Sequence, residues 1–324
     1  MLIQALCGSF PFSLKRGHEG LNTSGLTSRQ RMLAADGGLL LAAFFWGFSF
    51  AAMKEALETF PTFWLLALRF NAAFIILCVL FGRRFKGESK RLYSMGMISG
   101  ILLFAGYAAQ TFGLTLTTSS KQAFITSIYV VFVPLFTWVI TRILPGKYCF
   151  VSALLCCAGM WVLTSEDVSA FNIGDAFTVL CAVIFAAHVM YIGYATRIAS
   201  PVLLAILQIG VTGILSLVVA PFFSEWPGFH GSDGLYEIGF LVVFSTIGAF
   251  LLQNISQKYT SSTHAAILIS LEGVFGVFTG VLLLGEPFTF RMFVGCVIIF
   301  FAVLLSELAP FIFQKGESVV NDSF

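Results

Sequence analysis

The stretch 262–286 reads STHAAILISLEGVFGVFTGVLLLGE, and the interpretation of the whole chain starts from it. As a helix it is long enough to cross the hydrocarbon core of a bilayer, which is about 30 Å thick and takes about 20 apolar residues. It nevertheless carries an ionisable residue, Glu272, near its middle. A bare carboxylate at that depth costs about 2.5–3.5 kcal/mol on insertion scales. We therefore expect Glu272 to face protein or a water-filled cavity.

The composition of the chain is that of a membrane protein. Its 324 residues are 58% hydrophobic and 10% charged, with a mean hydropathy of +0.93. A soluble domain is about 25% charged, so this chain cannot cover itself with a wettable surface, and its predicted surroundings are the lipid bilayer. The net charge of +2 gives no indication of a nucleic-acid partner. The seven cysteines have no metal-ligand spacing, so we expect neither a metal site nor a cofactor and interpret the cysteines as small buried hydrophobes.

Ten apolar segments follow one another between residues 36 and 312, and each predicts a transmembrane helix. Their approximate bounds are 36–57, 61–82, 93–115, 120–142, 147–165, 174–195, 200–223, 234–256, 262–284 and 289–312. The breaks between them are marked by proline, glycine and charged residues. We predict an all-α integral membrane fold.

The two ends of the chain differ from the apolar segments. Residues 1–31 are rich in Gly, Ser, Thr and basic residues, and we interpret them as a disordered cytoplasmic tail. A signal peptide is the weaker interpretation, because no apolar core of about 7–15 residues precedes a small-residue cleavage site. Translation from Met32 is a third alternative. Residues 313–324 are expected to form a second cytoplasmic tail.

The distribution of lysine and arginine predicts the orientation of the chain. With a cytoplasmic N-terminus, 14 of the 18 basic residues fall on the inside and three fall on the outside, with Arg69 within the membrane. The inside residues are Lys15, Arg16, Arg29, Arg31, Arg83, Arg84, Lys86, Lys90, Arg91, Arg142, Lys147, Arg197, Lys258 and Lys315, and the outside residues are Lys54, Lys121 and Arg291. The prediction is a multi-pass protein of the cytoplasmic (inner) membrane with both termini in the cytoplasm.

The chain contains an internal repeat. A shift of 143 residues places Gln110 on Gln253 and Ser127 on Ser270, and a shift of 139 places Asp36 on Asp175. Each half contributes five helices, and because five is odd, the second half crosses the membrane in the opposite orientation. Inverted repeats of this kind are the plan of many secondary transporters. Duplication can also produce a channel or an intramembrane enzyme.

Motifs in both halves resemble those of the EamA domain of the drug/metabolite transporter superfamily. The segment 257–296, QKYTSSTHAAILISLEGVFGVFTGVLLLGEPFTFRMFVGC, resembles the end of the second EamA domain, and 117–139, TTSSKQAFITSIYVVFVPLFTWV, resembles the matching part of the first. WGFSFAAMK from Trp46, LRFN from Leu68 and the segment 174–197 add support. The resemblance implies two inverted five-helix EamA repeats, over 36–165 and 174–312, and the movement of small metabolites.

The chain departs from the family pattern beside Glu272. The family usually has Glu-Pro in the ninth helix, whereas here Glu272 is followed by Gly273. Without proline the carbonyl one turn earlier keeps its hydrogen-bond partner, so any kink is expected to come from glycine or not to form. The first half has a proline, Pro134, in its corresponding helix.

Two ionisable residues inside the spans are candidates for function. Burial disfavours the ionised form of Glu272, so this carboxyl group could bind and release a proton during a transport cycle. A structural ion pair with Arg69, or a contact with helix amides, is the alternative. Arg69 lies about eight residues into the second span and could clamp a substrate carboxylate, pair with Glu272 or extend toward the nearer interface.

Other polar and aromatic residues could line a central cavity or join helices. The candidates are Gln110, Gln253, Asn71, Ser270, Tyr129 and Trp46, with Tyr129 opposite Glu272 in the repeat alignment. His188 is expected to be packed or hydrogen-bonded, His264 to be solvated and Lys121 to determine topology. The GxxxG pairs at Gly96 and Gly276 favour close packing within the monomer, with a homodimer face as the alternative.

The leading hypothesis is a secondary transporter that binds a small-molecule substrate between the halves and works by alternating access. The sequence has no nucleotide-binding loop and no metal-ligand or paired-aspartate motif within its spans, so ATP hydrolysis and a membrane-embedded enzyme are disfavoured. A passive channel is the remaining alternative. It would give fluxes that do not saturate.

Overall fold

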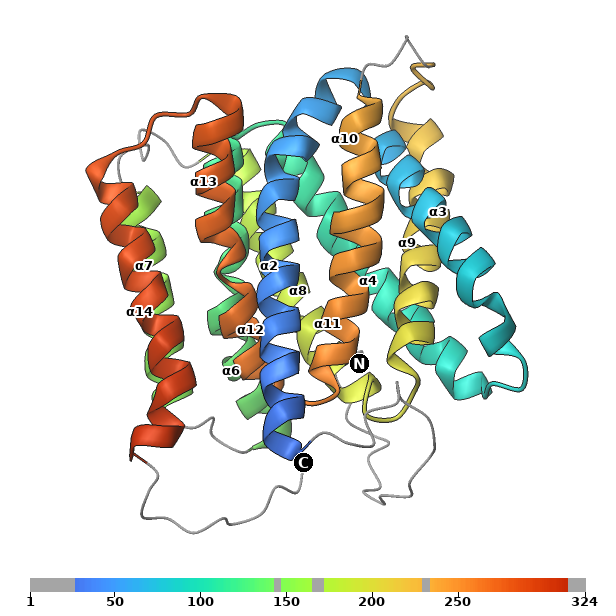
Figure 1. Cartoon of the computed structure of the whole chain (residues 1–324). Coiled ribbons are helices and arrows are strands. Elements are labelled where there is room, and N and C mark those ends of the chain that lie inside the picture. Colours follow the sequence, from blue (N-terminus) through green and yellow to red (C-terminus); the bar gives the residue numbers. More distant parts are fainter. Residues whose placement is uncertain (1–26, 143–146, 165–171, 229–233, 314–324) are drawn as a thin grey trace.

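The computed structural model describes residues 27–142, 147–164, 172–228 and 234–313, and within them the protein is all-helical (Figure 1). The helices of the first half are α2 (Ser28–Thr59), α3 (Thr62–Phe81), η1 (Gly82–Phe85), α4 (Lys90–Leu114), α5 (Ser119–Ser127), α6 (Tyr129–Thr141) and α7 (Lys147–Thr164). Those of the second half are α8 (Ile173–Ala195), α9 (Pro201–Phe223), α10 (Leu235–Phe240), η2 (Leu241–Gly248), α11 (Ala249–Gln257), α12 (Ser262–Ile269), α13 (Glu272–Leu284) and α14 (Phe290–Phe313).

These elements form ten helical segments, five in each half, and confirm the predicted fold class. Eight segments are long and apolar enough to cross a membrane, and α7 and α14 contain shorter apolar stretches. The fourth and ninth segments are each built from two helices, α5 with α6 and α12 with α13. The eighth consists of α10, η2 and α11, in which η2 is π-helical.

The first helix begins earlier than the predicted span. Thr27 caps it, because the Gln30 amide donates to Thr27 Oγ1 at 3.3 Å while the Thr27 amide donates to Gln30 Oε1 at 2.8 Å. Residues 28–31 of the predicted tail are therefore helical. The rest of that tail, 1–26, and most of the predicted C-terminal tail, 314–324, lie outside the described residues.

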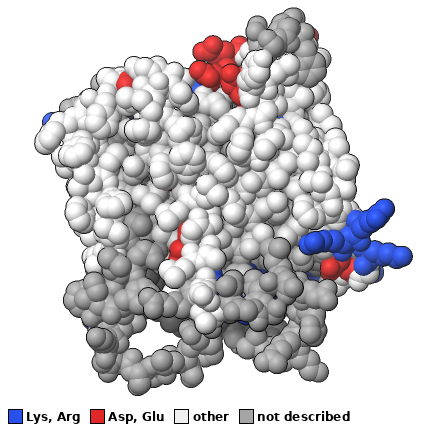
Figure 2. Space-filling model, in the orientation of Figure 1, with Lys and Arg blue, Asp and Glu red and all other residues white. Residues whose placement is uncertain are grey.

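The outer surface of the bundle is apolar. Many large hydrophobic side chains are exposed, including Val79, Phe222 and Phe290, each at about four-fifths of its full area. Figure 2 shows a broad uncharged band, with a basic patch at the lower right where η1 and the start of α4 lie. A surface of this kind is stable only in contact with lipid.

The helices of the two halves interleave, so that most helices of one half have their main contacts with helices of the other half. α3 lies along α9, α4 lies along α8 and α9, and α2 lies along α11 and α13 (Figure 1). α7 and α14 form a pair at one side of the bundle. The core is therefore shared between the repeats.

Both GxxxG pairs are used inside the monomer. A Cβ atom on Gly100 of α4 would lie 2.5 Å from Cβ of Val211 in α9. On α13, a Cβ atom on Gly276 would collide with Ala123, and one on Gly280 would lie 2.5 Å from Ser120 Oγ. These glycines let the backbones approach closely, so the predicted packing within the monomer accounts for them.

The fourth and ninth segments are interrupted at equivalent positions. α5 ends at Ser127 and α6 begins at Tyr129, while α12 ends at Ile269 and α13 begins at Glu272. At each interruption backbone amides donate to carbonyls three residues back instead of four, which tightens the helix locally. Tyr129 and Glu272 thus each open a half-helix inside the bundle.

The expectation that a kink near Glu272 would need Gly273 is corrected by the structure. The interruption is centred on Ser270 and Leu271, and Gly273 takes part only through its amide, which donates to the Ser270 carbonyl at 3.1 Å. At both sites the interruption follows a serine that bonds back into its own helix. Ser127 Oγ donates to the Ala123 carbonyl at 2.9 Å, and Ser270 Oγ donates to the Ile267 carbonyl at 2.6 Å. Such back-bonding bends helices. Gly273 instead lets α5 approach, since its Cβ would lie 2.9 Å from Ser127 Oγ.

Candidate functional site

A small cavity of about 40 Å³ lies between the two halves, near the interruptions of α5–α6 and α12–α13. The first half lines it with Trp46, Ser49, Phe50, Leu103, Tyr107, Gln110 and Tyr129, and the second half with Phe185, His188, Val189, Phe250, Gln253, Ile269 and Glu272. Each repeat thus contributes seven residues to the lining of the cavity.

Glu272 and Tyr129 lie together in this cavity. Each is the first residue of its half-helix, and the repeat places one on the other. Glu272 is 5% exposed, and among the described residues no lysine or arginine nitrogen lies within ion-pair distance of its carboxylate. The Tyr129 hydroxyl lies close to this carboxylate, but it is buried and makes no well-aligned hydrogen bond to any described residue.

Two equivalent glutamines line the cavity with different surroundings. Gln110 Nε2 donates to Thr126 Oγ1 at 3.3 Å. Gln253 is 2% exposed, and its Oε1 atom has no hydrogen-bond partner in the described part of the chain. An unpartnered buried acceptor costs free energy, so Gln253 is suited to meet a donor group that enters the cavity.

Trp46 forms part of the cavity wall and is held in place by the π-helical η2. Its Nε1 atom donates to the Ser245 carbonyl at 3.0 Å, and its ring packs edge-on against Phe250 with centroids 5.2 Å apart. The wider helical turn of η2 displaces its carbonyls and side chains from α-helical positions, which is a common feature of functional sites.

Arg69 does not line the cavity. Its side chain is fully buried, with Nε donating to Thr246 Oγ1 at 2.6 Å and Nη2 to Ser245 Oγ at 2.8 Å. Nη2 also lies 3.3 Å from the Tyr107 hydroxyl, and the guanidinium stacks 4.8 Å from the centre of the Tyr107 ring. In this conformation Arg69 neither pairs with Glu272 nor extends to an interface.

Two further predicted residues also lie outside the cavity lining. Asn71 Nδ2 donates to the carbonyls of Ala67 and Gly213 at 2.8 Å, which joins α3 to α9. Ser270 is used in the bend described above. The structure thus gathers five of the eight candidates, Trp46, Gln110, Tyr129, Gln253 and Glu272, and places Arg69, Asn71 and Ser270 elsewhere.

Two acid–base pairs join the repeats at opposite ends of the bundle, an ion pair of lysine with aspartate and a pair of histidine with aspartate that is ionic when the histidine is protonated. At the upper face, as drawn in Figure 1, Lys121 Nζ of α5 lies 2.8 Å from Asp175 Oδ2 of α8. At the lower face, His264 Nε2 of α12 lies 3.2 Å from Asp36 Oδ1 of α2. The expectation that His264 is solvated is corrected, because its side chain is mostly buried against Asp36. The role of Lys121 in topology stays a prediction.

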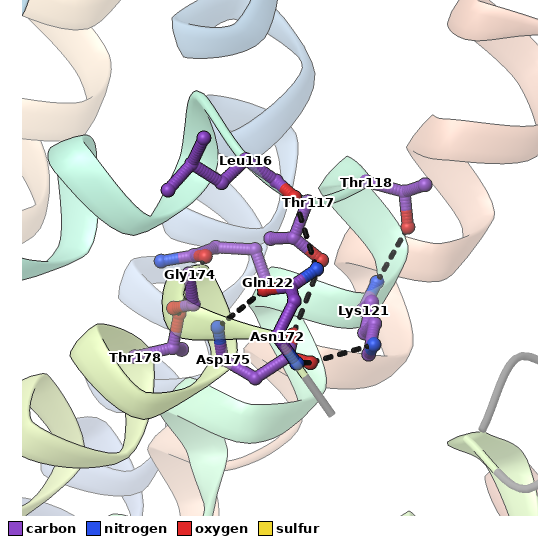
Figure 3. Close-up of polar contacts among 9 residues, drawn as sticks. All are labelled: Leu116, Thr117, Thr118, Lys121, Gln122, Asn172, Gly174, Asp175 and Thr178. Carbon is purple, nitrogen blue, oxygen red and sulfur yellow. Dashed lines mark hydrogen bonds and ion pairs between the residues drawn. The ribbon is translucent and has the colours of Figure 1, made fainter. Parts of the chain in front are cut away.

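Additional polar contacts reinforce the upper pair (Figure 3). Asp175 belongs to the capping box of α8, in which the Asn172 amide donates to Asp175 Oδ2 at 2.9 Å and the Asp175 amide donates to Asn172 Oδ1 at 3.0 Å. Thr117 Oγ1 donates to Asp175 Oδ1 at 3.4 Å, and Thr178 Oγ1 donates to Gln122 Oε1 at 2.7 Å. The start of α5 is thereby fastened to the start of α8.

Glu286 is a second connection at the upper face that the sequence did not single out. Its carboxylate accepts bonds from the amides of Ser119 and Ser120 at 3.1 and 3.2 Å and a short bond from the Ser120 hydroxyl. An acidic side chain at a helix N-terminus is favourable, because unpaired amides and the helix dipole are positive there. Glu286 therefore joins the end of α13 to the start of α5.

The repeat alignment contained a signal for the ion pairs. The shift of 139 places Asp36 on Asp175, and the shift of 143 places Lys121 on His264. Taken together, the two shifts make the pair Asp36–His264 equivalent to the pair Asp175–Lys121. Nothing in the sequence alone indicated that the members of each pair come from different halves.

Two inverted five-helix halves around a shared central cavity, joined at both ends of the bundle, are the plan of a membrane transport protein. A model of the EamA-like transporter family matches residues 33–165 and 172–308. The chain therefore belongs to the EamA-like transporter family. It is a multi-pass membrane transporter with two EamA domains, and it is not an enzyme.

Two comparisons with individual proteins agree with this assignment. An uncharacterized transporter of Archaeoglobus fulgidus is 34% identical over 287 residues, which are 86% of this chain and 87% of the relative. A protein of known crystal structure has a TM-score of 0.70 at 18% identity, over 86% of this chain and 97% of the other. The second likeness concerns the fold alone.

Proposed function

We propose that this protein is a secondary transporter that moves a small metabolite, such as an amino acid, an amine or a related compound, by alternating access. The proposed direction is export across the cytoplasmic membrane. The central cavity is the proposed binding site. Alternating access requires that the cavity open to one side of the membrane while the other side stays closed.

The observation that carries this proposal is the symmetric placement of the two ion pairs. Lys121 lies eight residues before Tyr129, and His264 lies eight residues before Glu272. At 1.5 Å per residue, each pair lies about 12 Å from the start of its half-helix. Because the two broken segments run in opposite directions, the pairs lie on opposite sides of the cavity.

The local structure around the two basic residues is also the same. The backbone amide of Lys121 donates to Thr118 Oγ1, and that of His264 donates to Ser261 Oγ, both at 3.2 Å. Each basic side chain then reaches an aspartate of the other repeat. Two equivalent inter-repeat contacts that break in turn would open the cavity to one face and then to the other.

The orientation proposed from the basic residues assigns the lower face to the cytoplasm. The exposed residues Arg83, Arg84, Lys86, Lys90 and Arg91 belong to this face, at the connection between α3 and α4. Excess positive charge in short connections is typical of the cytoplasmic side. In this orientation Asp36–His264 is the inner pair and Lys121–Asp175 is the outer pair, and both termini are cytoplasmic.

Cross-linking of each ion pair tests the proposal. In a chain whose seven cysteines are replaced by serine, Lys121→Cys with Asp175→Cys forms the outer test pair, and Asp36→Cys with His264→Cys the inner one. A short bifunctional methanethiosulfonate reagent is used, because a direct disulfide requires Cα atoms about 4.4–6.8 Å apart. The single-cysteine variants are the controls.

The readout is counterflow in liposomes with a panel of amino acids, amines and small acids. We expect saturable counterflow, its loss when either pair is cross-linked, and its recovery after reduction. Counterflow that continues with either cross-link in place would contradict alternating access. Flux that does not saturate, without counterflow, would support the passive channel instead.

A further inference from the structure

The cavity has an acidic group, an excess of free acceptors and an aromatic wall. We propose that it binds the ammonium group of a primary amine with an apolar body, and that it discriminates against carboxylates. The inference rests on the proposed transport function and specifies the substrate class of the same site. Three features of the cavity support it.

The first feature is the charge of the lining. Glu272 is the acidic residue among the fourteen lining residues, which include no lysine or arginine. The nearest buried cation, Arg69, directs Nε and Nη2 to Thr246, Ser245 and Tyr107, and the Tyr107 ring covers its face. A carboxylate in the cavity would therefore meet Glu272 without a guanidinium fork to compensate it.

The helix ends at the cavity do not reverse this preference. The N-termini of α6 and α13 carry partial positive charge, but the C-termini of α5 and α12 lie one or two residues away with equal and opposite partial charge. The dipoles at each interruption thus largely cancel. Glu272 is then the group of the lining that can carry a formal negative charge, and a bound ammonium group favours its ionised form.

The second feature is the surplus of acceptors. Gln253 Oε1 and the Tyr129 hydroxyl belong to side chains that are both about 98% buried; Gln253 Oε1 has no hydrogen-bond partner in the described residues, and the Tyr129 hydroxyl, close to the Glu272 carboxylate, makes no well-aligned bond. Together with the two oxygens of the Glu272 carboxylate, they offer four oxygen atoms to a ligand. An ammonium group has three N–H donors and no acceptor, so it complements this set.

His188 does not supply a competing cation. Its Nε2 atom lies 2.8 Å from Gln208 Oε1, Gln208 Nε2 donates to Asn254 Oδ1 at 3.3 Å, and Asn254 Nδ2 donates to the Pro201 carbonyl at 3.3 Å. This chain of bonds ends on a backbone acceptor, so Gln208 presents its oxygen and His188 is the donor. This series of hydrogen bonds contains no carboxylate that would stabilise a protonated His188 imidazole.

The third feature is the aromatic wall. Trp46 and Phe250 are in edge contact, and the Tyr107 ring lies 6.2 Å from Phe250 and 5.4 Å from Phe185 between centroids. Rings arranged around a site attract an ammonium group to their faces and also accept the apolar part of the ligand. The wall comes from both repeats.

Binding of four probes with one phenyl skeleton tests the inference. The probes are 2-phenylethylamine, L-phenylalanine, 3-phenylpropionate and 2-phenylethanol. We expect titration calorimetry of the purified full-length protein to give the amine at least about tenfold higher affinity than the carboxylate, with the amino acid between them. Equal or tighter binding of 3-phenylpropionate, or no saturable binding of 2-phenylethylamine, overturns the inference.

A variant pair identifies the responsible group. Glu272→Gln is expected to reduce amine affinity at least about tenfold and to leave 2-phenylethanol binding unchanged. Glu55→Gln, an equal loss of charge at an exposed position of α2, should leave both unchanged. Unchanged amine affinity in folded Glu272→Gln overturns the assignment. Because wild-type binding needs neither the variant nor counterflow, this outcome is separate from the cross-linking result.

Discussion

At the scale of single residues, the site contains two buried tyrosine hydroxyls with different surroundings. The Tyr107 hydroxyl contacts Arg69 Nη2 at 3.3 Å, whereas the Tyr129 hydroxyl lies close to the Glu272 carboxylate and makes no well-aligned hydrogen bond. Removing a buried polar group that has no partner costs little, and removing one that satisfies a buried cation leaves that cation short of a partner. We therefore expect the Tyr107 hydroxyl to contribute to stability and the Tyr129 hydroxyl to contribute to ligand binding.

We predict opposite effects of Tyr107→Phe and Tyr129→Phe. Tyr107→Phe should lower the free energy of unfolding by about 1–3 kcal/mol, because Arg69 loses one hydrogen bond in a buried setting. Tyr129→Phe should leave stability unchanged or slightly higher and weaken 2-phenylethylamine binding. Thermal unfolding in one detergent, with calorimetry of the same samples, measures both quantities. Equal loss of stability in the two variants contradicts the assignment.

At the scale of helices, the position of Glu272 depends on how closely α13 approaches α2. A Cβ atom on Gly47 would lie 2.9 Å from the Glu272 carbonyl and 3.0 Å from the Gly276 amide, both of which are backbone atoms. Backbone in the middle of a helix cannot give way as the end of a flexible side chain can. A methyl group at residue 47 must therefore displace α13, and with it Glu272.

Gly47→Ala is predicted to destabilise the protein by about 1–3 kcal/mol through overpacking, and to abolish counterflow. Gly239→Ala is the matched control, because its Cβ atom would have no neighbour within 4 Å and alanine favours a helix by about 1 kcal/mol over glycine. The control should unfold at the same or a slightly higher temperature. A Gly47→Ala protein with the thermal midpoint and counterflow of wild type would refute the tight contact.

The helices themselves could be predicted closely from the sequence, but their interruptions could not. Hydropathy and turn residues predicted segments 61–82 and 262–284, and the structure has α3 at Thr62–Phe81 and α12 with α13 across Ser262–Leu284. The early start of α2 was missed because its cap lies outside the apolar run. The interruptions depend on serine back-bonds and on the crossing of α5 and α13, which a single segment does not reveal.

At the scale of the whole molecule, the two ends of the bundle are related by the repeat but differ in strength. The two bases are similarly exposed, Lys121 at 15% and His264 at 18%, but the Asp175 side chain is fully buried within the network in Figure 3 and that of Asp36 is 11% exposed. Losing one partner of a buried pair leaves an uncompensated charge, and losing one partner of a more exposed pair costs little. The upper face should therefore be the harder one to open.

The difference in strength predicts unequal effects of removing each base. Lys121→Met should lower the free energy of unfolding by about 3–5 kcal/mol, because it leaves the Asp175 carboxylate buried without its cation. His264→Gln should cost about 0–1 kcal/mol, since the inner pair is partly exposed. Denaturation of both variants in the same lipid nanodiscs compares them. A larger loss for His264→Gln would reverse the proposed order of strength.

The site was only partly predictable at this scale, because it is assembled from both halves. Glu272, Tyr129 and Gln253 were identified from their chemistry and from the repeat, and all three line the cavity. Arg69 was a candidate site residue because it lies deep within the second membrane span. That position does not reveal that its guanidinium group is hydrogen-bonded by neutral side chains outside the cavity lining. Predicting the pairs Lys121–Asp175 and His264–Asp36 would require knowing which helices of the two repeats are in contact. That information comes from the tertiary fold.

The unequal faces have a kinetic consequence for a carrier built on this plan. If the upper face is held more strongly, the empty protein spends most of its time open toward the lower face, and ligand arriving there finds a ready site. Ligand arriving from above must wait for a less populated state, so its half-saturation concentration is higher. Detailed balance still fixes the direction of net flux by the gradients alone. The network around Asp175 would thus determine which conformation of the empty carrier is more populated, without determining the direction of net transport.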